Sequence, residues 1–89
     1  MEHEVDDYTL AIAAILKREQ QRPGQPSYTQ LAKITGMSRP TVDRMLNGQR
    51  DMTLRYLRAL CTALGLDPAE VVDEAEAALD ADPTEPVAD

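Results

Sequence analysis

Three arginines, Arg39, Arg44 and Arg50, lie within fifteen residues, in the stretch GMSRPTVDRMLNGQR from 36 to 50. A guanidinium group carries a planar fork of N–H donors. It can therefore bind phosphate oxygens or, with two bonds at once, the O6 and N7 acceptors of guanine. The whole chain is nevertheless acidic, with a formal net charge of -7. Such a cluster in an acidic chain indicates a surface that binds a polyanion.

The charge is segregated along the chain. All nine Lys and Arg fall between Lys17 and Arg58, where only three acids oppose them, so that this segment carries +6. The first sixteen residues hold four acids and the last thirty-one hold nine, and neither end has a base. A basic middle between acidic ends is typical of a protein that binds nucleic acid, although an ordinary solvated surface would also account for it.

Few residues are suited to catalysis. The one histidine, His3, stands between Glu2 and Glu4 near the terminus, and the one cysteine, Cys61, falls in an apolar stripe that predicts the core. Both serines stand where helices begin. Because no nucleophile can be paired with a base, the sequence predicts a protein that is not an enzyme and has no metal site and no cofactor.

The apolar spacing and the capping residues predict five helices. These run over about residues 5–21, 28–35, 39–47, 54–64 and 68–79. Ser27, Ser38, Thr53 and Asp67 stand at starts, and Gly36 and Gly65 stand at ends. Pro40 fits the first turn of the third helix, where its missing N–H has no partner within the helix in any case. The second helix is expected to turn Leu31, Ala32 and Ile34 inward. The fourth is expected to do so with Leu54, Leu57, Leu60, Cys61 and Leu64.

The fold class expected is all-α, a single compact domain over residues 1–79 with an acidic, disordered tail over 80–89. No apolar run approaches the roughly 18 residues of a membrane span, and the N-terminus is acidic where a signal peptide would be basic. With a single cysteine, the chain is expected to be cytoplasmic and to have no membrane partner.

The order and spacing of several short motifs resemble the Cro/C1-type (XRE) helix-turn-helix family. They are Leu31-Ala32, Gly36, Ser38, Thr41-Val42, Leu46-Asn47-Gly48 and the Ala-Leu-Gly-Leu of residues 63–66, and they span roughly residues 27–72. The resemblance implies a five-helix domain like that of the λ repressor. It also implies a second motif helix, 39–47, that enters the major groove of double-stranded DNA.

This geometry assigns base contacts to four residues on the outer N-terminal face of that helix: Arg39, Pro40, Thr41 and Arg44. In this family, phosphate contacts come from the start of the first motif helix and from the loop after the second. By position these residues are Tyr28, Gln30, Asn47, Gln49 and Arg50. Pro40 departs from the polar residues common at its position, so no base preference is carried over.

The function expected is a sequence-specific, DNA-binding transcriptional regulator of phage-repressor type. Two alternatives remain on the same fold. One is the antitoxin of a toxin–antitoxin pair, and the other is an antirepressor or acidic DNA mimic that binds protein only. The acidic C-terminal region could serve a protein partner in either case.

A homodimer on a palindromic operator is also expected, because one helix in one groove reads few base pairs. The fifth helix carries more apolar residues than a short helix needs for its own core. The sequence therefore predicts a two-fold interface at or near Leu66, Val72 and Leu79.

Overall fold

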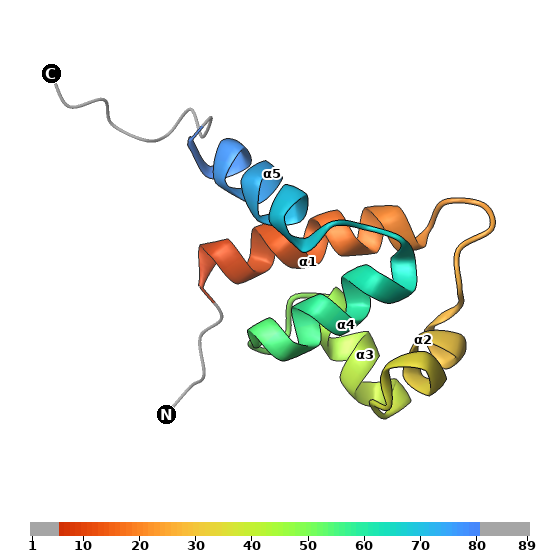
Figure 1. The fold of residues 1–89 in the computed structure, drawn as a ribbon. Helices are drawn as coiled ribbons and strands as arrows, with labels where there is room; N and C mark the ends of the chain where they lie inside the picture. The colour runs from red at the N-terminus through yellow and green to blue at the C-terminus, as the bar shows by residue number, and fades with distance from the viewer. Residues whose placement is uncertain (1–5, 81–89) are drawn as a thin grey trace, which may run out of the picture.

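The computed structural model describes residues 6–80 as five α-helices joined by short connections (Figure 1). The helices are α1 (Asp7–Gln20), α2 (Tyr28–Thr35), α3 (Arg39–Leu46), α4 (Leu54–Leu64) and α5 (Pro68–Asp80). In Figure 1, α2 and α3 lie together at one end of the molecule and α5 lies at the other. The all-α, five-helix fold class is thereby confirmed. The tail expected after Leu79 lies outside the described residues, apart from Asp80, which ends α5.

The helix starts follow the predicted capping chemistry. Ser27 and Gln30 form a reciprocal capping box, in which Gln30 N–H donates to Ser27 Oγ and Ser27 N–H donates to Gln30 Oε1. Thr53 caps α4 by accepting from Tyr56 N–H at 3.2 Å. Gly36 ends α2 with a φ of 80°, a left-handed conformation that glycine adopts without a Cβ clash. Local sequence therefore determines where these helices begin and end.

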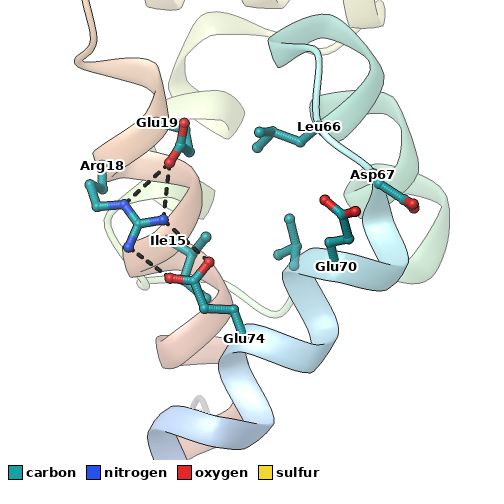
Figure 2. Close-up of a pocket in the computed structure, with 8 residues that line it drawn as sticks. Ile15, Arg18, Glu19, Leu66, Asp67, Glu70 and Glu74 are labelled. Atoms are coloured by element: carbon teal, nitrogen blue, oxygen red, sulfur yellow. Dashed lines mark hydrogen bonds and ion pairs between the residues drawn. The ribbon is translucent and has the colours of Figure 1, made fainter.

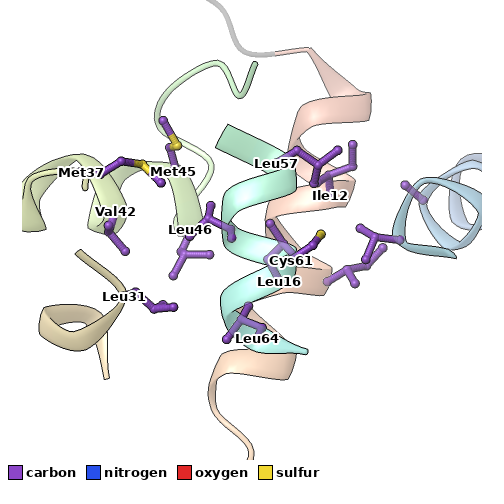
Figure 3. Packing of buried hydrophobic residues seen from close by; sticks show 14 residues of the cluster. Ile12, Leu16, Leu31, Met37, Val42, Met45, Leu46, Leu57, Cys61 and Leu64 are labelled. Atoms are coloured by element: carbon purple, nitrogen blue, oxygen red, sulfur yellow. The ribbon is translucent and has the colours of Figure 1, made fainter. Parts of the chain in front are cut away.

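The core is a single apolar cluster to which every helix contributes (Figure 3). Its largest fully buried side chains are Leu16, Leu31, Val42, Met45, Leu46, Leu60 and Cys61. Burial, with a smaller contribution from the charge of nearby Asp67, raises the pKa of the Cys61 thiol to about 11. Cys61 is therefore a core residue, as its place in the apolar stripe predicted.

Two residues expected in the core are exposed. Ile34 is 60% exposed, because α2 buries a narrow stripe centred between Leu31 and Thr35 and Ile34 lies roughly 80° from its centre. Leu54 is 77% exposed. It is the first residue of α4 and lines an open groove with Met52, Val72 and the start of α1. The prediction that Ile34 and Leu54 point inward was wrong.

Polar contacts bind α5 to α1 (Figure 2). Arg18 donates to Glu74 through Nη1 at 2.7 Å and Nη2 at 3.3 Å, and its Nη2 also donates to Glu19 at 3.0 Å. The hydrogen bond from Arg18 lowers the pKa of Glu74. At the other end of α1, Tyr8 donates its hydroxyl to Glu76 at 2.8 Å. These contacts are exposed and contribute little to the stability of the fold.

No helix within residues 6–80 has the length and apolar character to cross a membrane.

Candidate nucleic-acid interface

The unit α2–turn–α3 is held together from inside. Leu31 of α2 and Val42 of α3 are completely buried, and Met37 in the turn between them is 8% exposed. Ser38 caps α3 by accepting from Thr41 N–H at 3.2 Å. α3 also packs against α1. These interactions fix the axis of α3 relative to the rest of the domain.

One face of α3 is left free by this packing. Val42, Met45 and Leu46 are buried, and a helix advances about 100° per residue, so the outward direction falls near Pro40 and Arg44. Both are exposed, and they stand four residues apart, one above the other on the helix surface. Within residues 6–80, the Arg44 guanidinium has no hydrogen bond or ion pair. Its five donors are therefore available to a ligand.

Arg39 and Thr41 flank this outermost face. The Arg39 guanidinium lies over the ring of Tyr28, 5.9 Å from its centroid, within the range of a cation–π interaction. Tyr28 is half-buried, and burial followed by the charge of Asp43 raises its pKa, while Arg39 opposes that shift. Thr41 Oγ1 accepts from Ser38 Oγ at 2.8 Å, so its own hydroxyl hydrogen remains available.

Arg50 has a similar aromatic partner in α4. Its guanidinium lies 5.9 Å from the ring centroid of Tyr56. Sequence reasoning predicted neither stacked pair, although two of the three tyrosines do fall within the basic segment. Each ring restricts the arginine above it, which reduces the entropy cost of ordering that side chain on a ligand.

The remaining residues expected at phosphates differ in how available they are. Gln30 Oε1 is used in the capping box, which leaves its amide N–H groups free to donate. Gln49 is exposed, and its backbone N–H donates to Arg44 O at 2.8 Å. Asn47 is engaged at both ends of its amide, by Lys17 and by Asp43. Lys17 enters this region from α1, and no pattern in the sequence predicted it.

The loop after α3 is held close to α1. Gly48 has a φ of 70°, and a Cβ built there would meet Leu10 Cδ2 at 2.7 Å. The backbone conformation favours glycine, and a larger residue would also require the exposed Leu10 side chain to move. This close approach fixes the start of the segment that carries Gln49 and Arg50.

Two of the three residues predicted at a dimer interface, Leu66 and Val72, line different hollows. Val72 and Leu79 are half-buried and stand seven residues apart, which places them on one face of α5. Leu66 instead lines a hollow with Ile15 and Val71 on the other flank of α5 (Figure 2). Exposed Leu54 joins Val72 at a groove lined by the start of α1, by α4 and by α5.

The chain matches a family model described as a helix-turn-helix domain over residues 11–74. No curated protein matches the sequence significantly. The family match begins in α1, includes all of α2, the turn and α3, and ends within α5. The chain therefore belongs to the helix-turn-helix domain family.

Proposed function

We propose that this protein is a sequence-specific DNA-binding transcriptional regulator that inserts α3 into the major groove. The observation that supports this most strongly is the exposed face of α3, where Arg44 has no partner among residues 6–80. Proteins of the helix-turn-helix class contact base edges with the N-terminal part of their second motif helix. On that geometry Arg39, Pro40, Thr41 and Arg44 face the bases, and Arg44 binds the O6 and N7 of a guanine.

The flanking polar residues would hold the backbone of the DNA. Tyr28 and Gln30 at the start of α2 would contact phosphates of one DNA strand. Gln49 and Arg50 in the loop after α3 would contact phosphates of the other strand. Asn47 was also expected to contact a phosphate, but its side-chain amide is already hydrogen-bonded to Lys17 and Asp43. We therefore propose that Asn47 contributes to DNA binding through its backbone or by holding Asp43 in place.

The placement of the acids favours DNA binding over DNA mimicry. Asp73, Glu74 and Glu76 belong to α5, which packs against α1 and α4 and does not contact α3. A protein that imitates DNA would instead need carboxylates on the helix-turn-helix surface. The binding surface thus presents positively charged side chains to the phosphates of DNA. Repression would follow if the protein, bound at its operator, excludes RNA polymerase. A binding role of this kind requires no catalytic group or cofactor.

Selection of bound duplexes from random DNA with the purified protein tests this proposal. A sequence-specific regulator enriches one motif, and a homodimer enriches it as an inverted repeat with centres about one helical turn apart. Recovery of random sequences would contradict the proposal.

The dimer surface is proposed to be the face of α5 with Val72 and Leu79, extended by Leu54 of α4, rather than one that includes Leu66. The variant Leu54→Asp should lower the affinity ratio between the inverted repeat and a single half-site by about tenfold or more, because linked half-sites gain avidity. Ile34→Asp is the matched control, since it adds the same charge at another exposed apolar residue. The ratio would be measured by fluorescence anisotropy, and equal ratios for both variants would exclude this surface.

A substitution at Arg50 tests the proposed binding to phosphate. Arg50→Ala should weaken binding to operator and to random duplex by the same factor. It should also reduce the slope of log affinity against log salt by about one unit, because one fewer phosphate is neutralised. The measurement is a salt series on both duplexes. A weakening confined to the operator would instead mean that Arg50 reads bases.

A further inference from the structure

A chain of hydrogen bonds links α1 to the recognition surface of α3. Lys17 Nζ donates to Asn47 Oδ1 at 2.6 Å. The same amide then donates through Nδ2 to the carboxylate of Asp43 at 3.0 Å and to the Asp43 carbonyl at 2.8 Å. Neither the family match nor the predicted DNA contacts assign a role to Lys17, which lies thirty residues from Asn47 in the sequence.

Lys17 and Asp43 together set the direction in which the Asn47 amide faces. An ammonium group can only donate, so it must meet the oxygen end of the amide. The nitrogen end is then directed at Asp43, whose carboxylate can only accept. Without Lys17, the amide loses its charged donor and is held only by the two acceptors of Asp43, so its bond to the Asp43 carboxylate is weaker.

Asp43 lies between two competing partners on α3. Arg39, Asp43 and Asn47 follow one another at intervals of four residues and so form one row along the helix surface. Oppositely charged residues four apart on a helix attract, yet the Arg39 guanidinium lies over the Tyr28 ring and makes no ion pair with Asp43. In this arrangement the Asn47 amide is hydrogen-bonded to the Asp43 carboxylate, and the Arg39 guanidinium lies over the Tyr28 ring.

We propose that Lys17 is a positioning residue for DNA recognition. Its bond to Asn47 keeps the Asn47 amide hydrogen-bonded to the Asp43 carboxylate, and this prevents Asp43 from forming an ion pair with Arg39. Arg39 then stays on Tyr28 at the entrance of α3, with its donors directed to DNA. This inference rests on the proposed function, since it assigns Arg39 to the DNA-binding face.

The test is rescue by a second substitution. Lys17→Met removes the ammonium group and keeps most of the side-chain length. It should lower affinity for the selected duplex by about fivefold to tenfold, a smaller effect than removal of a whole base-reading arginine. Adding Asp43→Asn removes the competing charge and should return affinity to within about twofold of Asp43→Asn alone. Thermal unfolding would confirm that each variant is folded.

Lys33→Met is the matched control, because Lys33 is exposed and has no partner within residues 6–80. It removes the same charge, and Asp43→Asn should not rescue any weakening that it causes. If the weaker binding of Lys17→Met persists in the Asp43→Asn background and the salt slope falls, Lys17 contacts phosphate directly and the positioning role is wrong.

A measurement without DNA separates this inference from the proposed function. Nuclear Overhauser effects between the Arg39 side chain and the Tyr28 ring should be present in the wild type and in Lys33→Met. They should disappear in Lys17→Met. Their persistence in Lys17→Met would overturn the inference even if the protein binds DNA. Failure of the wild type to select any duplex would refute the proposed function. The effect of Lys17→Met on the stacking of Arg39 on Tyr28 could still be measured without DNA, and it would test the positioning role of Lys17 separately.

Discussion

Replacing Arg44 by alanine is expected to weaken binding to the operator by about 1–3 kcal/mol and to relax the preference at one base pair in each half-site, a G·C pair. The reason is the position of Arg44. It is exposed on the outermost face of α3, one turn beyond Pro40, and it has no partner among residues 6–80. On the proposed geometry a side chain there would reach the floor of the groove, and arginine is the residue best suited to the paired acceptors of guanine.

The measurement is a comparison of Arg44→Ala and wild type on the operator, on single-base variants of it and on a scrambled duplex. Arg58→Ala is the matched control, because Arg58 is exposed on α4, outside the proposed interface, and also has no partner in the part of the chain that the structure describes. It should change all affinities little and equally. An equal weakening on operator and scrambled DNA for Arg44→Ala would reduce Arg44 to a phosphate ligand.

Replacing Leu31 by alanine is expected to lower the free energy of unfolding by about 2–5 kcal/mol, the range for a large side chain deleted from a packed core. Leu31 is completely buried and belongs to the same cluster as Val42 of α3 and Met37 of the turn. A cavity there removes the packing that fixes α2 and α3 together. Since small domains are stable by only about 5–15 kcal/mol, a substantial unfolded fraction would appear at elevated temperature.

Ile34→Ala is the control on the same helix. Ile34 is three residues further along α2 but 60% exposed, so its truncation should change the unfolding free energy by less than about 0.5 kcal/mol. Urea titrations followed by circular dichroism would give both values. Similar decreases for the two variants would contradict the assignment of Leu31 to the core and Ile34 to the surface.

The helices themselves could be predicted from sequence because their ends depend on local chemistry. Ser27, Ser38 and Thr53 each accept a bond from an N–H three residues on, and such caps need no tertiary context. The two glycines at helix ends act in the same local way. The order of these signals also carried the resemblance to the family that the chain belongs to.

What the sequence could not provide depends on packing between distant residues. The inward placement of Ile34 and Leu54 was inferred from spacing alone, whereas their exposure follows from which neighbours cover α2 and the first turn of α4. The hydrogen bond from Lys17 to Asn47 joins α1 to the end of α3, and no spacing of residues in the sequence predicts such a bond.

In the candidate site, too, local sequence predicted some features and packing between distant residues determined the others. The residue types at the start of α3 predicted a DNA-binding face. The stacking of Arg39 on Tyr28 and of Arg50 on Tyr56 depends on how α2 and α4 are placed beside them. The contacts with DNA remain predictions for all of these residues.

The central claim is that the exposed face of α3 reads DNA sequence. Its most direct test is the affinity of the wild-type protein for its selected duplex and for a scrambled duplex of equal length and composition, at one physiological salt concentration. Base reading by α3 predicts binding to the selected duplex that is tighter by about 10³-fold or more, the range of specific regulators. Equal affinity for both duplexes would contradict it, because phosphate contacts alone would then explain all of the binding.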